Sequence, residues 1–315
     1  MRNSHLNIIR PSKKNDELIK KKLEKNEIVA LPTETVYGLA GNAYSKKAVA
    51  KIYKTKGRNK YNPLIIHFKD MKSLKKEVQT NKHFTKLSKH FCPGPITFIL
   101  NKKKGSKITK LAHKNLKTLA VRIPKNEDIQ NILKIINFPL AAPSANKSGS
   151  LSPTKALHVY DEFKNKFTIL DGGPTKYGIE STVIDLTSKP VILRKGAIPS
   201  RTLEKFISLK DNNEKSSLKS PGLIGKHYSP GIPIYLNRER PYSGGALITF
   251  NKKKSKNKNC FFFSPKIKGR KSLDIFSLMR LIKNKKFTSI SVNKIPNSDI
   301  YKSIADRLMR ASIHE

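Results

Sequence analysis

Residues 30–68 constrain the fold most, because short apolar runs alternate there with a polar loop and a helical pattern. The apolar run 28–31 is closed by Pro32, which predicts a buried strand that ends at a surface crevice. The loop after it would present three polar side chains at that crevice, Thr33, Glu34 and Thr35. A helix over 47–55 with one apolar face and a central strand over 64–68 come next. The chain is therefore predicted to have an α/β fold.

Two fixed cations, Lys56 and Arg58, flank Gly57 directly after the predicted helix. If this segment is extended, residues two apart point the same way, so both cations would face one anion. The glycine would let the backbone come close to that anion. The pair predicts a phosphate or carboxylate site or, alternatively, an ordinary solvated basic turn.

The formal net charge is +43, from 65 Lys and Arg against 22 Asp and Glu. A balance this basic is typical of nucleic-acid binders. Lysine is nevertheless spread through every predicted helix and loop and accompanies abundant Asn and Ile, which favours a general compositional bias for most of the charge. Any RNA affinity would be independent of sequence and strongly weakened by salt.

The chain has 315 residues, enough for one sizeable core and a smaller second one, so we expect two domains. Residues 1–209 would form the larger domain, 210–232 a linker rich in Lys, Ser, Asn, Gly and Pro, and 233–315 a small domain. Strands and helices alternate in the small domain as in a Rossmann-like α/β unit, without a glycine phosphate fingerprint.

The sequence has no apolar run that approaches a membrane span, and its start has no hydrophobic targeting core. We therefore expect a cytoplasmic protein without membrane contact. The two cysteines, Cys92 and Cys260, fall in different halves and lack metal-ligand spacing. Neither a disulfide nor a structural zinc site is expected.

Two polar residues lie within apolar strand patterns. His67 ends the predicted central strand, where a lone histidine is more often a satisfied core residue than a catalytic one, although the nearby cation pair favours function. Arg122 lies in the apolar middle of a strand predicted over 118–124. A buried arginine needs an anionic partner, so it makes a structural salt bridge or belongs to a site, and the scarcity of acids favours the site.

The loop 143–154, PSANKSGSLSPT, consists of small hydroxyl and amide residues and precedes a predicted helix. Ser152 or Thr154 should be the N-cap of that helix. Such loops can cradle phosphates through backbone N–H groups and a helix N-terminus, but most serine-rich loops only connect elements.

Several segments together resemble one family, the YrdC-like threonylcarbamoyl-AMP synthases in their long form with an appended C-terminal domain. They are LPTETVYGL, KGRNKYNPLIIHF, CPGPITFIL, AVRIP, APSANKSGSLSPT, GIESTVIDL, LRKG, SPGLIGKHYSP and IADRLMRAS. The K-x-R and S-x-N pairs are the most specific, here Lys56 with Arg58 and Ser144 with Asn146. The resemblance implies a twisted mixed sheet with flanking helices and a concave basic cleft.

The resemblance also implies a reaction in which L-threonine, bicarbonate and ATP give threonylcarbamoyl-adenylate and pyrophosphate. Downstream threonylcarbamoyl-transferase proteins would pass the group to an adenosine of certain tRNAs, and a weak contact with tRNA is possible. Threonine would take up carbon dioxide as a carbamate, which attacks the α-phosphate of ATP. Because no protein nucleophile is needed, catalysis would come from positioning and charge neutralisation, with Mg²⁺ bound mainly through ATP.

The resemblance divides the expected site residues into two groups. Around ATP it places Lys56, Arg58, Asn62, Thr118, Ser144, Asn146, Ser152 and Arg194. Around threonine it places Thr33, Thr35, His67, Arg122 and Ser181. Lys56, Arg58 and His67 would act in catalysis, with His67 orienting the carbamate or bicarbonate. Arg122 would pair with both oxygens of the threonine carboxylate.

Two positions depart from the family pattern. Cys92 stands where members commonly have a tryptophan, and we expect only a packing change. Gly225 stands where some relatives place a tyrosine against the nucleotide, which leaves open whether the linker caps ATP, although Ser220, His227 and Tyr228 remain.

Two other functions compete with the synthase. A basic double-stranded RNA or tRNA-binding module without catalysis would need cations and aromatic residues, but it has no use for the residues expected around threonine. A carbamoyl-transferring maturation enzyme would carry zinc-finger modules, for which this chain lacks the cysteines.

Overall fold

The computed structural model describes residues 7–59, 61–210, 228–252, 258–265 and 274–313. Within this part of the chain, ten strands form one mixed sheet in the order β1-β8-β2-β3-β7-β4-β6-β5-β9-β10. Their bounds are β1 Ile8–Ile9, β2 Val29–Leu31, β3 Gly38–Asn42, β4 Ile65–His67, β5 Ile96–Asn101, β6 Thr118–Arg122, β7 Leu140–Ala141, β8 Thr168–Leu170, β9 Thr182–Asp185 and β10 Val191–Arg194.

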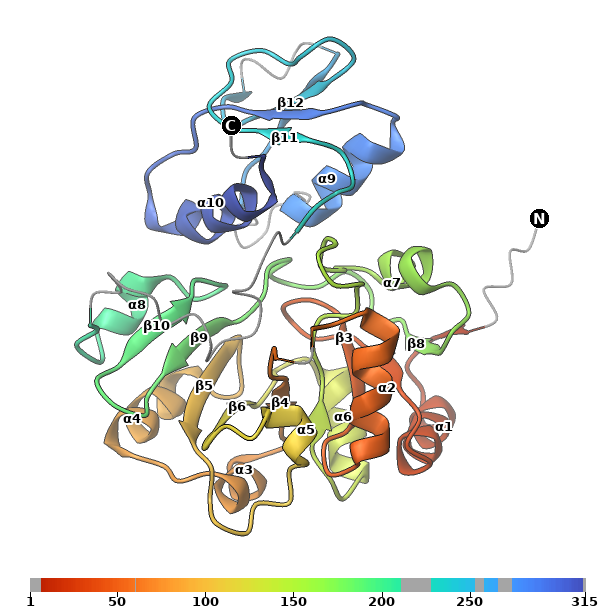
Figure 1. Cartoon of the computed structure of the whole chain (residues 1–315), viewed down its shortest axis with the longest axis vertical. Helices are drawn as coiled ribbons and strands as arrows, with labels where there is room; N and C mark the ends of the chain where they lie inside the picture. The colour runs from red at the N-terminus through yellow and green to blue at the C-terminus, as the bar shows by residue number, and fades with distance from the viewer. Residues whose placement is uncertain (1–6, 60, 211–227, 253–257, 266–273, 314–315) are drawn as a thin grey trace.

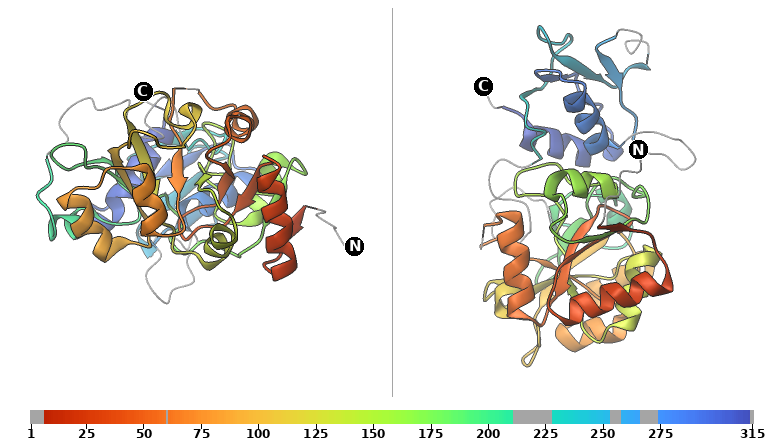
Figure 2. Two further views of the ribbon diagram at one scale, coloured as in Figure 1. Left: turned by 90° about the horizontal axis from the view of Figure 1, so that it is seen from below. Right: turned by 90° about the vertical axis from the view of Figure 1, so that its right-hand side faces the viewer.

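Helices cover both faces of this sheet (Figures 1 and 2). They are α1 Lys13–Glu24, α2 Lys46–Lys56, α3 Met71–Glu77, α4 Lys82–Phe91, α5 Lys110–His113, α6 Glu127–Ile135, α7 Ala156–Phe163 and α8 Ser200–Glu204. The alternation of side chains along a strand explains the two layers. In β2, Val29 and Leu31 pack with α1 and α6, whereas Ala30 packs with α2 on the opposite face.

The C-terminal part has its own sheet. Strands β11 Ile234–Tyr235, β12 Ala246–Thr249, β13 Cys260–Phe262 and β14 Ile290–Val292 are all parallel, in the order β11-β14-β12-β13. Helices α9 Ile275–Asn284 and α10 Asp299–Ala311 lie between this sheet and the larger part of the molecule (Figure 1). The predicted Rossmann-like alternation is confirmed.

Three local predictions were wrong. Residues 38–42, for which no strand was predicted and whose first two residues were expected in the loop, form β3, which pairs antiparallel with β2 because both strands are apolar enough to be buried. The N-cap of α7 is Lys155, not Ser152 or Thr154. The segment around Gly57 is not extended: α2 ends at Lys56, and Gly57 is its left-handed C-cap, a conformation that glycine adopts without steric cost.

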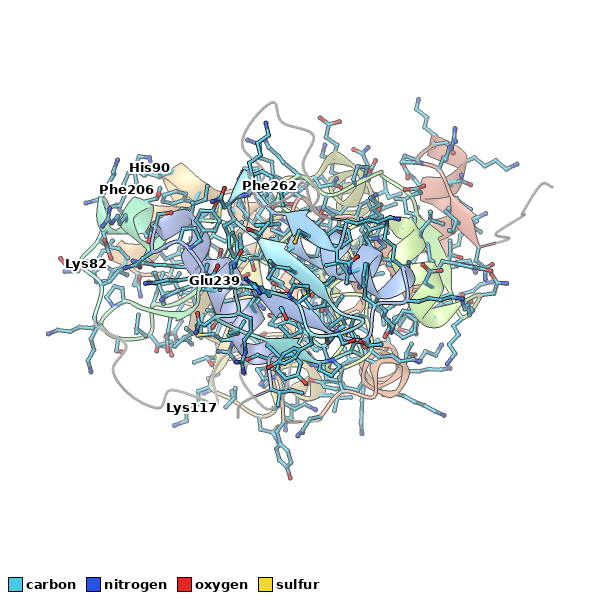
Figure 3. The ribbon with its side chains drawn as sticks, turned by 90° about the horizontal axis from the view of Figure 1, so that it is seen from above. Lys82, His90, Lys117, Phe206, Glu239 and Phe262 are labelled. Atoms are coloured by element: carbon cyan, nitrogen blue, oxygen red, sulfur yellow. The ribbon has the colours of Figure 1, made fainter. Side chains whose placement is uncertain are left out.

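Nitrogen-tipped side chains project all around the periphery of the view from above, with Lys82 and Lys117 at separate places on it (Figure 3). In this view the two labelled lysines do not belong to one patch. Among the described residues, no helix is long and apolar enough to span a membrane. Ser220, Gly225 and His227 lie outside the described residues.

Candidate functional site

A polar cavity opens at the ends of β4 and β6, next to the loop that follows β2. His67 and Arg122 are direct partners in the parallel pairing of these strands, so their side chains lie together. The cavity is lined by Thr33, Thr35, Val36, Gly38, Arg58, Ile65, His67, Arg122, Ala142, Pro143, Ser144, Glu180, Ser181, Arg194 and Tyr228. Segments far apart in the sequence therefore converge on one site.

The loop after β2 is held by its own threonines. Thr33 Oγ1 accepts hydrogen bonds from the N–H groups of Thr35 and Val36 and donates to the Val36 carbonyl at 2.6 Å. The hydroxyls of Thr33 and Thr35 are 2.8 Å apart. Arg122 Nη1 donates to Thr35 Oγ1 at 2.9 Å, which joins this loop to β6. The loop thus presents two hydroxyls in a fixed geometry.

Arg122 makes a salt bridge and also lines the cavity, so the two alternatives considered for it do not exclude one another. Its Nη2 lies 2.7 Å from Glu34 Oε1, and both side chains are buried. The other oxygen of Glu34 accepts from the N–H groups of Lys125 and Asn126 at 3.1 and 3.3 Å. A buried ion pair needs such additional hydrogen bonds. Glu34 therefore holds the Arg122 guanidinium in place.

His67 is buried, and its Nδ1 has no hydrogen-bond partner among the described residues. Burial, together with the positive charge of Arg122, lowers the pKa of His67 to about 3. The imidazole is therefore neutral at physiological pH. A neutral imidazole can orient a ligand through a hydrogen bond, but it is not a source of positive charge.

We expect the ring of His67 to stay neutral across roughly pH 5 to 8, where an ordinary histidine titrates. Nitrogen-15 NMR of the ring nitrogens checks this, with His67→Gln to assign the signal. Between the folded pKa of about 3 and the ordinary value of 6.5, the unfolded chain binds more protons, so His67 reduces the free energy of unfolding as the pH falls below 6.5. A His67 signal that titrates near 6.5 would contradict the burial argument.

Ser181, which directly precedes β9, is held by two neighbours. Its hydroxyl lies 2.8 Å from Thr97 Oγ1 and accepts from Arg194 Nη2 at 3.1 Å. Arg194 also donates to the Ser181 carbonyl at 3.0 Å. These contacts arise because β9 pairs with both β5 and β10.

Arg58 is half-buried and donates to main-chain carbonyls, that of Asn62 at 3.3 Å and that of Pro63 at 3.2 Å. Burial lowers its pKa to about 10, and the charge of Arg194 contributes in the same direction. Three guanidiniums, those of Arg58, Arg122 and Arg194, thus line the cavity with one carboxylate, that of Glu180. This excess of positive charge favours an anionic ligand.

Lys56 has a different role from Arg58. Its ammonium group donates to the carbonyls of Ser144 and Asn146, both at 2.5 Å, and its side chain is buried. Asn146 Nδ2 in turn donates to the carbonyls of Lys147 and Ser150. The K-x-R and S-x-N pairs are therefore in contact, and in this structure Lys56 fastens the 143–151 loop to the end of α2.

The structure brings eight of the predicted site residues together in the cavity wall: Thr33, Thr35, Arg58, His67, Arg122, Ser144, Ser181 and Arg194. The other five predicted residues lie outside that wall in the described part of the chain: Lys56, Asn62, Thr118, Asn146 and Ser152. Thr118 begins β6, at the opposite end of the strand from Arg122. Ser152 is buried and donates from its hydroxyl to Glu180 Oε1 at 2.5 Å.

Three residues in or next to the cavity wall were not among the predicted ligand contacts: Glu34, which was predicted only to lie at the crevice, Thr97 and Glu180. Glu34 stands between the two predicted threonines, and Glu180 directly precedes Ser181 in a segment without other charges until Asp185. An acid at such a position in a very basic chain is a usable signal. Thr97 offers none, since it is one threonine in an apolar strand.

Two family models match the chain. The Sua5/YciO/YrdC model, described as "Telomere recombination", matches residues 21–196. The model described as "Threonylcarbamoyl-AMP synthase, C-terminal domain" matches residues 198–312.

Named relatives agree with these models. The threonylcarbamoyl-AMP synthase of Pyrococcus abyssi is 40% identical over 223 residues, which are 67% of this chain and 64% of the relative. That of Bacillus subtilis is 41% identical over 229 residues, which are 70% of this chain and 65% of the relative. These alignments thus span a little less than two thirds of each relative.

A solved structure matches over a longer range. The crystal structure of P. abyssi Sua5 complexed with L-threonine superposes with a TM-score of 0.83 and 29% identity, covering 97% of this chain and 96% of that one. The predicted fold, a mixed sheet with flanking helices and a small α/β C-terminal part, is confirmed.

Proposed function

The chain belongs to the Sua5/YciO/YrdC family, and from this premise we propose that it is a threonylcarbamoyl-AMP synthase. It would convert L-threonine, bicarbonate and ATP into threonylcarbamoyl-AMP and pyrophosphate, as a nucleotidyltransferase. The observation that carries the proposal is one cavity that collects residues expected around both substrates. We assign Arg122, Thr35 and His67 to the threonine end and Arg58 and Arg194 to the ATP end.

The Arg122 end suits the amino acid. Its guanidinium is fixed by Glu34 before any ligand arrives, so little reorganisation is needed when a carboxylate binds. The hydroxyls of Thr35 and Ser181 can hydrogen-bond the other polar groups of threonine. The neutral ring of His67 can orient the carbamate or bicarbonate without repelling the amine. The bound threonine named for the P. abyssi structure supports this choice of substrate.

The Arg58 end suits the phosphates of ATP. Guanidiniums neutralise the negative charge that builds up when a carbamate attacks the α-phosphate and pyrophosphate leaves. Holding both substrates in one cavity supplies the remaining acceleration through proximity. Lys56 and Asn146 would contribute by shaping the 143–151 loop, and Asn62, Thr118 and Ser152 stay predictions as ATP contacts.

Magnesium would enter with the nucleotide. Among the described residues, no three His, Cys, Asp or Glu side chains cluster as a metal site, and Glu180 in the cavity wall and Glu34 behind it are engaged with arginines. This donor set does not fit a metal held by the protein, but it fits Mg²⁺ carried on ATP phosphates. When bound, the ion would neutralise phosphate charge.

The RNA-binding alternative receives less support. An RNA-binding protein contacts the phosphodiester backbone with accessible cations, whereas Arg122 and Arg194 are buried in the cavity. A cytoplasmic location, transfer of the product by downstream proteins and a weak contact with tRNA stay predictions.

Purified protein with Mg²⁺, ATP, L-threonine and bicarbonate tests the proposal. Pyrophosphate release should require both threonine and bicarbonate, and the adenylate should be identified by mass spectrometry. Pyrophosphate release that proceeds without either of them, or no release at all from folded protein, would contradict the proposed function.

A further inference from the structure

One wall of the cavity is supported from behind by the C-terminal part of the chain. Val36 and Tyr228 line the cavity, and both belong to a hydrophobic cluster that contains residues of α9 and α10. The rings of Tyr228 and Phe276 are stacked with centroids 5.5 Å apart. The two parts of the molecule therefore share one core directly behind the site.

Arg307 of α10 lies at the centre of this contact. Its side chain is fully buried, and its Nε donates to Glu180 Oε2 at 3.0 Å. Its Nη1 donates to Asp306 Oδ2 at 2.6 Å, and its Cζ lies 5.2 Å from the centroid of the Tyr228 ring. One side chain of the C-terminal part thus contacts two residues of the cavity wall, Glu180 and Tyr228.

Glu180 connects Arg307 with the cavity wall. Its Oε1 accepts from Ser152, and its carbonyl accepts from the Ala197 N–H at 3.0 Å. Burial alone would raise the pKa of Glu180, but the charges of Arg307 and Arg194 outweigh it and lower the pKa to about 2. The Glu180 side chain is therefore a buried carboxylate, and its position depends on its ion pair with Arg307.

A second arginine strengthens the same junction. Arg280 of α9 donates to the carbonyls of Leu151 at 2.6 Å and Ser152 at 2.9 Å. The loop that carries Ser152 is therefore held from one side by Glu180 and from the other by α9. By contrast, the bonds that hold Arg122 go to Glu34, Thr35 and Gly94, and none of these residues belongs to α9 or α10.

We propose that Arg307 is a positioning residue, through which the C-terminal part orients Glu180 and Tyr228 beside the ATP end of the cavity. The proposal rests on the proposed function, since it assigns that end to ATP. The proposal predicts an effect on one substrate only. Loss of Arg307 weakens the binding of ATP and leaves the binding of threonine nearly unchanged.

Calorimetric titration of the full chain with a non-hydrolysable ATP analogue, and separately with L-threonine, tests this selectivity. Arg307→Met alone would leave Glu180 buried without its partner, so the main variant is Arg307→Met with Glu180→Gln, which removes both charges. The Kd of the ATP analogue should rise at least about 10-fold, as expected when charge-assisted hydrogen bonds are lost. The Kd of threonine should change by less than about 3-fold, since Arg122, the proposed partner of its carboxylate, is held by Glu34 and not by Arg307 or Glu180.

Arg310→Ala is the matched control. Arg310 lies one turn away on α10 and also pairs with Asp306, at 3.0 Å, but its side chain is partly exposed whereas that of Arg307 is fully buried. The Arg310→Ala variant should bind both ligands as the wild-type chain does. Urea unfolding of every variant checks that the chain is folded.

The outcomes distinguish a failure of the role of Arg307 from a failure of the proposed function. A folded double variant that binds the ATP analogue as tightly as wild type overturns the role of Arg307, and so does an equal loss for both ligands. If the double variant does not fold, Arg307→Lys decides on the same criteria, because an ammonium group cannot reproduce the bonds to Glu180 and Asp306 together. A wild-type chain that binds neither ligand overturns the proposed function instead.

Discussion

Replacing Arg58 with alanine is expected to lower kcat/KM for pyrophosphate release by about 100-fold or more, the usual effect of removing one preorganised charge donor from a transition state. The fold should persist, because Arg58 is half-buried and the bonds described for it go to main-chain carbonyls, those of Asn62 and Pro63. Initial rates at varied ATP measure the effect, and the urea midpoint of unfolding measures stability.

The control for Arg58 is Lys54→Ala, which removes an exposed cation from the last turn of α2, just before Arg58 in the sequence. This control should keep wild-type rates. An Arg58→Ala enzyme with near-normal kcat/KM would show that the phosphates bind elsewhere. Equal losses in both variants would mean that the general positive field of the chain, and not the cavity, attracts ATP.

Replacing Arg122 with methionine is expected to have two large effects. It leaves Glu34 buried without its cation, so the free energy of unfolding should fall by about 3–5 kcal/mol. It also removes the proposed partner of the threonine carboxylate, so the Kd of threonine should rise at least about 10-fold. Urea unfolding and calorimetry measure the two effects separately.

A second substitution separates stability from binding. Adding Glu34→Gln to Arg122→Met removes the unpaired charge, so most of the lost stability should return, while threonine binding stays weak. Recovery of threonine binding together with stability would contradict the assignment of Arg122 to the carboxylate and leave it with a structural role alone.

Local pattern in the sequence predicted most of the elements around the site. The apolar runs of β2, β4 and β6 and the amphipathic face of α2 depend on neighbouring residues only, and periodicity reports such features. The loop before Gly38 was predicted correctly, but the strand β3 was not, since GLAGN carries two glycines and no β-branched residue.

Partners far apart in the sequence could not be predicted. Arg122 pairs with Glu34, 88 residues away, and Arg307 with Glu180, 127 residues away. These pairs depend on the strand register and on how the C-terminal part packs against the larger part. Local patterns in a single sequence report neither of these. The same limit applies to Lys56, whose chemistry indicated an anion site but whose ammonium group holds two carbonyls of a distant loop.

The division of the cavity between two substrates is the central claim, and one set of titrations tests it most directly. The Kd of ATP and the Kd of L-threonine are measured by calorimetry for the wild-type chain, for Arg58→Ala, and for Arg122→Met with Glu34→Gln. We expect a crossed pattern, in which the first variant loses ATP and keeps threonine, and the second loses threonine and keeps ATP. Two variants that lose the same ligand, or that both bind as wild type does, would contradict the claim.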